Sequence, residues 1–389
     1  MKKNIYNLIL LSLKKIYIKK NFFYDSHSPI LNNQEKFYLN KVIDSSFVSS
    51  VGKYVDKFEK LLKNYTKAKY VICLSSGTAA LHVALYLSKV QRNDEILIPS
   101  FNFVASTNVT LLLGAIPHFI DCDEKTNSID IEKLSIYLKK NTYLKNGNCI
   151  NKKTNKIIKA CIPTYSYGSG FDIKKLLSIC RFYKIKVIED SSEALGTFIN
   201  SKHAGTFASF GVLSFNGNKI ITSGGGGAIL TNSKYLAKKA RYISSTAKKN
   251  ISNFSKIHTE FGFNYRMPNL NAALGYSQIL KLKKILKHKK LLFKKLKEEL
   301  AHLNNYIEVY QEPAFCNNNY WFQLLKIKDK KIQKNKLLKI LNKNKIQTTS
   351  AWTLLNSYSY LRKYPSMSLE TSKKLSKNLL CLPSNNFNI

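Results

Sequence analysis

Acidic residues are scarce in this sequence. Among 389 residues, 23 Asp and Glu stand against 63 Lys and Arg, which gives a formal net charge of +40. Such an excess of positive charge is typical of proteins that bind nucleic acid or a membrane surface. No nucleic-acid recognition motif accompanies it, however, and the lysines are spread over almost the whole chain. We therefore expect no nucleic-acid partner, and we expect the charge to attract small anions.

Paired cysteines are absent as well. The seven cysteines form no C-x-x-C pair and do not cluster with histidine. This pattern argues against a zinc site and against a disulfide framework. We expect no metal site and a reducing, cytoplasmic location.

No hydrophobic run is long enough to cross a bilayer. The run from Ile5 to Leu13 follows Lys2 and Lys3 as in a signal peptide, but Lys14 and Lys15 stand where a cleavage site would need small residues. We predict that residues 1–30 form a basic N-terminal segment with a surface helix and without membrane insertion.

Helix-like and strand-like segments alternate from about Lys53 onward, as a parallel sheet covered by helices requires. We predict sheet strands at 70–74, 95–98, 117–121, 157–162, 186–189, 212–215 and 228–231. Helices are predicted at 53–64, 78–88, 103–113, 131–140, 173–183 and 270–300, and residues 143–156 are expected to be a polar connection. Further strands at 320–327 and 346–350 flank a helix at 332–344. The pattern indicates a large α/β domain with a mostly parallel sheet over residues 31–275, and a small α+β domain with a linking helix over residues 276–389.

The segment from Ser75 to Leu81 follows a predicted strand and opens a predicted helix. Backbone N–H groups, a hydroxyl and the positive end of a helix dipole meet at such a point, so an anion can bind there. The alternative is a plain helix cap, and this segment alone does not separate the two.

Two acids, Glu189 and Asp190, end an apolar strand, and Glu193 follows. Open α/β sheets bind ligands at the carboxyl ends of their strands. An aspartate there can hold a heterocyclic nitrogen protonated. Paired acids can also bind a metal, but no histidine follows before His203.

Lys219 lies between two apolar strands, and the glycines from Gly224 to Gly227 follow it. Most lysines are solvated surface charges, whereas a partly buried amine in such a region can have the lowered pKa that imine chemistry needs. The glycine run lacks the P-loop spacing, so we expect it to serve close backbone packing. An anion site, an acid and a lysine in this order match the needs of pyridoxal phosphate: a phosphate anchor, a partner for the pyridinium nitrogen and a Schiff-base lysine.

With these segments in place, the sequence resembles the DegT family of sugar aminotransferases from about residue 30 to near the end. The elements that carry the resemblance are Ser76 to Leu81, Glu189-Asp190, Ser214-Phe215 with Lys219, the glycine run, Asn264 to Met267, and Ala272 to Gly275. The resemblance implies the PLP-dependent transferase fold of the aspartate aminotransferase type. It also implies a pyridoxal 5'-phosphate cofactor.

The resemblance also implies roles for single residues. Lys219 would be the Schiff-base lysine and proton shuttle, Asp190 the pyridinium partner, and Glu193 would approach the ring hydroxyl. Phe103 would stack on the cofactor ring, although without the resemblance a core phenylalanine would be the better interpretation. The phosphate contacts implied are Gly77, Thr78, Ser214 and, from a neighbouring subunit, Asn264. A homodimer would then be needed for a complete site.

Within the family, Phe47 to Glu59 and Asn216 to Thr222 resemble the branch associated with bacillosamine and legionaminic acid. This implies transfer of an amino group from glutamate to carbon 4 of a nucleotide-linked 4-keto-6-deoxy-N-acetylhexosamine. Two alternatives remain: a sugar dehydratase, in which histidine would replace Lys219, and a non-catalytic protein that binds cofactor or sugar. Two positions depart from the family: Tyr165 stands where histidine is usual, and Thr349 where this branch usually has arginine.

Overall fold

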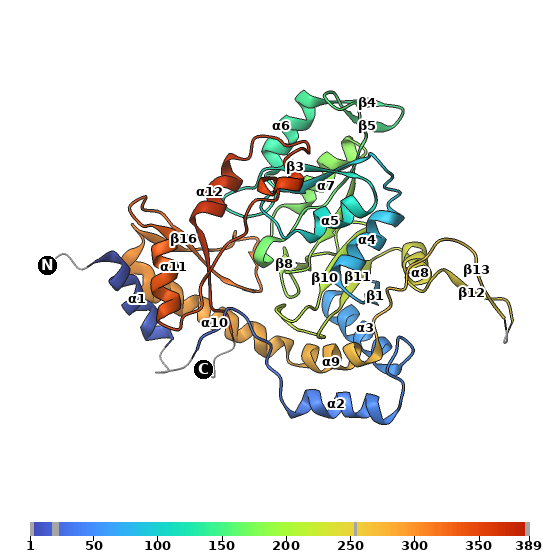
Figure 1. Cartoon of the computed structure of the whole chain (residues 1–389), viewed down its shortest axis with the longest axis horizontal. Coiled ribbons are helices and arrows are strands. Elements are labelled where there is room, and N and C mark those ends of the chain that lie inside the picture. The colour runs from blue at the N-terminus through green and yellow to red at the C-terminus, as the bar shows by residue number, and fades with distance from the viewer. Residues whose placement is uncertain (1–3, 18–22, 253–254, 386–389) are drawn as a thin grey trace.

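A seven-stranded sheet forms the centre of the molecule (Figure 1). A computed structural model describes residues 4–17, 23–252 and 255–385. The strand order is β1-β11-β10-β7-β6-β2-β3. These strands are β1 (Tyr70–Leu74), β2 (Glu95–Pro99), β3 (Ile116–Ile120), β6 (Ile158–Cys161), β7 (Lys186–Asp190), β10 (Phe210–Ser214) and β11 (Gly227–Thr231). Only β11 runs antiparallel to its neighbours, so the predicted mostly parallel sheet is confirmed.

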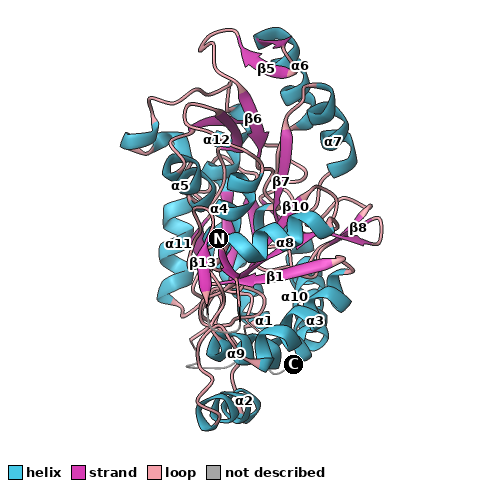
Figure 2. Cartoon of the chain, turned by 90° about the vertical axis from the view of Figure 1, so that its right-hand side faces the viewer, coloured by secondary structure: helices cyan, strands magenta, loops and turns pink. Residues whose placement is uncertain are grey.

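Helices cover both sides of this sheet (Figure 2). They are α3 (Lys53–Thr66), α4 (Gly77–Leu87), α5 (Ala105–Leu112), α6 (Ile131–Asn141), α7 (Ile173–Phe182), α8 (Lys234–Ile243) and α9 (Asn269–Leu280). Strand β1 illustrates the packing. Val71 and Cys73 join the core beneath α3 and α9, whereas Ile72 and Leu74 join the core beneath α4. The alternation follows from the two-residue period of a strand buried on both faces.

The C-terminal part is built on a four-stranded antiparallel sheet of order β14-β16-β18-β17. Its elements are α10 (Leu282–Leu300), β14 (Ile307–Val309), β16 (Gln323–Ile327), α11 (Lys334–Lys343), β17 (Thr349–Ser350), α12 (Glu370–Asn378) and β18 (Leu379–Leu382). The predicted helix at 270–300 is two helices, because α9 ends before Lys281 and α10 begins after it.

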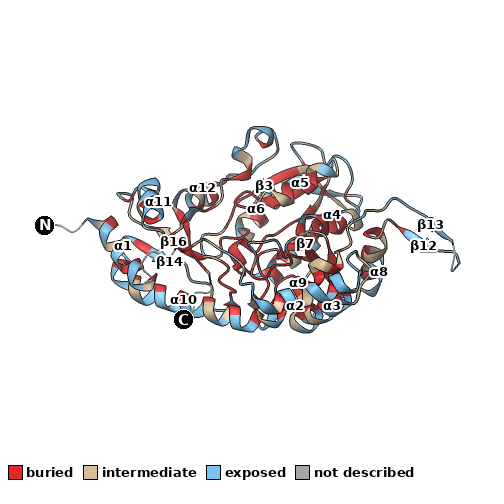
Figure 3. Cartoon of the chain, turned by 60° about the horizontal axis from the view of Figure 1, so that its bottom comes forward, coloured by how far each residue is buried: buried red, intermediate tan, exposed pale blue. Residues whose placement is uncertain are grey.

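The predicted N-terminal helix is present as α1 (Ile5–Ile16). Its lysines Lys14 and Lys15 are exposed, but Tyr6, Ile9 and Leu13 are buried against α10 and α11. The helix is therefore part of the C-terminal core along one face (Figure 3). Lys2 and Lys3 before this helix, and Lys19 and Lys20 after it, lie outside the described residues.

The described chain has one further α-helix and several short strands. They are α2 (Asn33–Asp44), β4 (Thr142–Lys145), β5 (Asn148–Asn151), β8 (Phe198–Ile199), β9 (Lys202–His203), β12 (Lys248–Asn250), β13 (Lys256–His258) and β15 (Cys316–Asn317). The connection expected at 143–156 is thus a hairpin of β4 and β5, turned at Asn146 and Gly147, both of which have positive φ. Within the described ranges, no helix combines the length and apolarity needed to cross a bilayer.

Candidate active site

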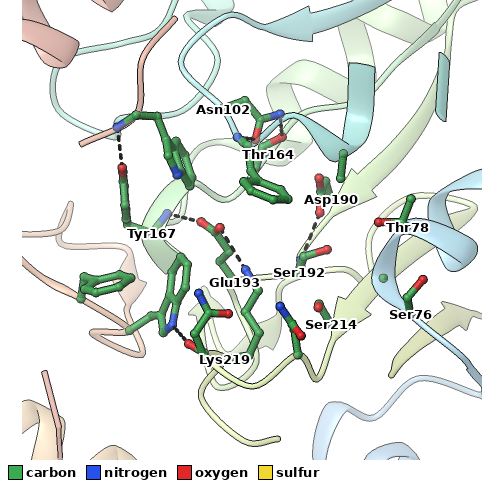
Figure 4. Close-up of a pocket in the computed structure, with 18 of the residues that line it drawn as sticks. Ser76, Thr78, Asn102, Thr164, Tyr167, Asp190, Ser192, Glu193, Ser214 and Lys219 are labelled. Carbon is green, nitrogen blue, oxygen red and sulfur yellow. Dashed lines mark hydrogen bonds and ion pairs between the residues drawn. The ribbon is translucent and has the colours of Figure 1, made fainter. Parts of the chain in front are cut away.

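All of the predicted site residues except Asn264 line one pocket at the carboxyl edge of the central sheet. Strands β1, β7 and β10 all end at this edge, and they bring Ser76, Asp190 and Ser214 to one pocket of about 530 Å³ (Figure 4). The opposite wall comes from the C-terminal part, which contributes Trp321 and Trp352. The pocket therefore lies between the two parts of the chain.

The start of α4 forms one end of the pocket. Ser76 is in an extended conformation, and its Oγ accepts a hydrogen bond of 3.0 Å from the N–H of Ala79, so it caps the helix. Gly77 and Thr78 also line the pocket, and the first N–H groups of a helix have no partner within it. The helix cap is therefore confirmed, and an anion site in the same turn stays a prediction.

Glycines allow strands and helix to approach closely here. A Cβ on Gly227 would lie 2.4 Å from the backbone nitrogen of Gly77, and a Cβ on Gly77 would lie 2.9 Å from the Cβ of Ser214. Gly224 has a φ of +77°, in the left-handed region that favours glycine. The expectation that the glycine run serves close packing is confirmed at Gly227.

Glu189 and Asp190 have different surroundings. Asp190 lines the pocket, where its Oδ2 accepts a hydrogen bond of 2.9 Å from Ser106 Oγ and its Oδ1 accepts one of 3.2 Å from the N–H of Ser192. Glu189 instead accepts N–H groups of Gly205, Phe207 and Ala208. Because successive side chains of a strand point to opposite faces, the two carboxylates do not converge on one ion. Within the described chain, no group of three or more His, Cys, Asp or Glu side chains is arranged to hold a metal.

Lys219 forms an ion pair inside the pocket. Its Nζ lies 3.1 Å from Glu193 Oε1, and the other carboxylate oxygen of Glu193 accepts a hydrogen bond of 2.8 Å from the N–H of Tyr167. The lysine side chain is 12% exposed. Burial raises the pKa of Glu193 to about 7, against the opposing effect of Lys219. The Glu193 carboxylate can therefore gain or lose a proton close to neutral pH.

An aromatic wall faces these groups. The Lys219 Nζ lies 4.1 Å from the ring centroid of Trp321. The rings of Tyr167 and Trp352 are stacked, with centroids 4.1 Å apart and an interplanar angle of 19°. Tyr167 has a φ of 56°, a conformation that is uncommon for a residue other than glycine and that is often found at functional sites. No sequence pattern pointed to these three residues, although both tryptophans of the chain are among them.

Phe103 and Asn264 occupy different environments. Phe103 lines the pocket and is 56% exposed, so the alternative of a core phenylalanine is wrong. Asn264 is exposed, forms an isolated bridge with Ser245, and does not line the pocket of its own chain. Its contribution to a neighbouring subunit stays a prediction.

The two departures from the family pattern also lie in different places. Tyr165 is fully buried outside the pocket, where its hydroxyl donates to Glu189 Oε2. Thr349 lines the pocket. Among the described residues that line it, Lys219 is the only Lys or Arg. Among the described residues, the pocket therefore has no second Lys or Arg that could take the place of the arginine usual at position 349.

Known proteins are similar to this chain in sequence and in fold. Residues 29–386 match the model of the DegT/DnrJ/EryC1/StrS aminotransferase family. The chain is 32% identical over 323 residues to GDP-perosamine synthase of Vibrio cholerae, covering 83% of each protein. It is 30% identical over 370 residues to the 3-oxo-glucose-6-phosphate:glutamate aminotransferase of Bacillus subtilis, covering 92% of this chain and 76% of the relative. The solved structure of Helicobacter pylori PseC, an aminotransferase of pseudoaminic acid biosynthesis, superposes with a TM-score of 0.83 at 23% identity, covering 93% of this chain and 94% of that one.

Proposed function

Because the chain belongs to the DegT/DnrJ/EryC1/StrS family of aminotransferases, we propose that it uses pyridoxal 5'-phosphate to move an amino group from glutamate to a nucleotide-linked keto sugar. The sugar we propose is a UDP-linked 4-keto-6-deoxy-N-acetylhexosamine. The observation that supports this best is the convergence of Lys219, Asp190 and the start of α4 on one pocket. Each of the three cofactor requirements would be met there by a different part of the chain.

The residues present fit the cofactor. The start of α4 with Ser214 would hold the phosphate, and Asp190, kept in place by Ser106, would pair with the ring nitrogen. Phe103, which is exposed in the pocket, would cover the ring face. When bound, pyridoxal phosphate supplies a carbonyl that takes up the amino group and a cationic ring that draws electrons from the reacting carbon.

The residues of the chain would then position the reacting groups and transfer protons between them. The Lys219 amine takes a proton from the carbon of the amino donor, and later returns one to the carbon of the sugar. Glu193 accepts a hydrogen bond from the lysine and so holds the amine at the pocket. Asp190 keeps the ring nitrogen protonated, since a buried carboxylate beside a cation stabilises its charge.

The donor and the sugar class draw support from relatives. The Bacillus relative is named for glutamate as the amino donor, and the Vibrio relative is named for the synthesis of a GDP-linked amino sugar. The choice of UDP and an N-acetylhexosamine rests on the resemblance of Phe47 to Glu59 to the bacillosamine and legionaminic acid branch. The stacked rings of Tyr167 and Trp352 offer an apolar surface for the deoxy carbon of such a sugar.

A homodimer is part of the proposal. Asn264 is exposed and outside its own pocket, as a residue that completes the phosphate site of a neighbouring copy would be. Mixing two inactive variants, Lys219→Ala and Asn264→Ala, tests this. In an equimolar mixture about half of the dimers should be hybrids, and one of the two sites of each hybrid has both residues, so the mixture should regain up to about a quarter of the wild-type rate; no recovery would contradict a shared site.

A substrate panel tests the reaction itself. UDP-, GDP- and dTDP-linked 4-keto-6-deoxy sugars are each incubated with glutamate and pyridoxal phosphate, and the products are read by mass. We expect amination of the UDP-linked N-acetyl sugar. Amination of the GDP-linked sugar alone would contradict the branch, and no amination of any sugar, with no absorbance change on adding cofactor, would contradict the function.

A further inference from the structure

The indole of Trp321 lies directly over the amine of Lys219. The Nζ is 4.1 Å from the ring centroid, and Glu193 Oε1 is 3.1 Å from the same nitrogen. We propose that Trp321 is a positioning residue: its ring face holds the Lys219 ammonium against Glu193 and so fixes the direction in which the amine enters the pocket. This inference rests on the proposed function, in which Lys219 is the reacting amine.

The position of Trp321 is fixed by three hydrogen bonds. Its indole N–H donates to the carbonyl of Asn218 at 2.6 Å, and its backbone N–H donates to Asn319 Oδ1 at 3.0 Å. Its carbonyl accepts a hydrogen bond of 3.2 Å from Lys289 Nζ. The residue is 3% exposed. The ring therefore cannot turn away from Lys219 without breaking its partly buried indole hydrogen bond.

Asn319 also connects the two groups that flank the lysine. Its Nδ2 donates to the carbonyl of Glu193 at 2.6 Å and to that of Leu195 at 3.0 Å, while its Oδ1 accepts from Trp321. The buried side chain of Asn319 thus links the backbone of Glu193 to the backbone of Trp321 and sets the distance between them. A lysine has a long flexible stem, so a ring face on one side and a carboxylate on the other remove most of its rotational freedom. A cation over a desolvated indole is also attracted by the ring itself.

Fluorescence of the protein without cofactor tests the contact. The chain has two tryptophans, Trp321 and Trp352, so the variant Trp352→Phe has Trp321 as its single tryptophan. At one pH near neutrality we expect its emission to differ from that of Trp352→Phe/Lys219→Met, because the methionine variant has no amine over the indole. The same emission in both variants would overturn the proposal.

The rate of reaction with the cofactor tests whether Trp321 positions the Lys219 amine. The rate at which the violet absorbance of the lysine-bound cofactor appears is compared in the wild type, Trp321→Phe and Trp321→Leu, each checked for its melting temperature. We expect Trp321→Leu to be slower by about tenfold, as loss of a desolvated cation–π contact predicts. Trp321→Phe keeps a ring face and should be slower by less than about threefold. Equal rates in Trp321→Leu and the wild type would overturn the proposal. If the wild type never takes up cofactor, the proposed function fails, while the fluorescence comparison still decides the contact.

Discussion

Lys219 and Glu193 form an ion pair of 3.1 Å in which the carboxylate is 4% exposed and the lysine 12%. Glu193 is also held by the N–H of Tyr167, so the carboxylate is fixed independently of the lysine. In the proposed reaction the Lys219 amine forms and breaks a covalent bond. Its hydrogen-bond partner must therefore stay in place when the amine moves away. The following predictions test this pair and the groups around it.

Lys219→Ala should remove both the violet absorbance and the activity. Without an amine, no covalent bond to the cofactor forms and no group moves the proton, so we expect turnover to fall by roughly 1000-fold or more. The measurement is an absorbance spectrum after addition of pyridoxal phosphate, followed by the sugar assay. Lys238→Ala, on the exposed side of α8, is the control and should behave as the wild type. Turnover that survives in Lys219→Ala would refute its role.

Glu193→Gln should change how stability depends on pH. Burial raises the pKa of Glu193 from 4.5 to about 7, so the folded protein keeps a proton that the unfolded chain has released. The free energy of unfolding therefore falls as pH rises from about 4.5 to about 7, by up to about 3 kcal/mol from this group. Urea unfolding at several pH values should show this fall reduced in Glu193→Gln. Glu308→Gln, at an exposed position on β14, should keep it.

Lys289→Met should have the opposite pH signature. Lys289 is 1% exposed, and burial lowers its pKa from 10.5 to about 7. Between these values the unfolded chain binds the proton and the folded protein does not, so wild-type stability gains roughly 3 kcal/mol between about pH 7 and about pH 9.5 from this group. The methionine variant should lose this gain. The neighbouring exposed Lys290→Met is the matched control, and an identical pH dependence in both variants would contradict the lowered pKa.

Tyr165→Phe should affect stability more than catalysis. The hydroxyl donates to buried Glu189, which keeps its three N–H donors when the hydroxyl is removed. We expect a loss of about 1 to 3 kcal/mol in the free energy of unfolding. The kcat should stay within about threefold of the wild type, because Tyr165 does not line the pocket. A large fall in kcat with unchanged stability would show that Tyr165 acts in the reaction.

Gly227→Ala should damage the anion site, whereas Gly225→Ala should not. A Cβ at position 227 would lie 2.4 Å from the nitrogen of Gly77, but at position 225 the nearest atom is the carbonyl oxygen of Ser75, 3.9 Å away. The first change must displace the start of α4 or strand β11, at a cost of about 1 to 3 kcal/mol. Urea unfolding and cofactor titration measure both effects. Equal cofactor affinity in the two variants would contradict a phosphate site at the start of α4.

Much of the part that carries the seven-stranded sheet could be predicted, because the signals for its helices and strands are local. Strand β1 was predicted over the residues that form it, and β2, β7 and α4 to within one residue at each end. Short β-branched runs separated by helical periodicity define such elements without reference to distant residues. The segment from Ser75 to Leu81, Asp190 and Lys219 also followed from local position, because the carboxyl ends of parallel strands share one edge. Phe103 and Ser214 followed only from the resemblance to the family.

The contacts that complete the pocket were decided by tertiary structure. Trp321 is about a hundred positions from Lys219 along the chain, and nothing in the run from Asn317 to Phe322 indicates that an indole will cover an amine. The tertiary structure also decided the surroundings of Tyr165, because the fold turns its hydroxyl toward Glu189. The sequence by itself determined which residue types follow each strand. The packing of the C-terminal part against the sheet decided which side chains line the pocket. The sequence could not show this, because the packing joins segments that are far apart in the chain and share no local pattern.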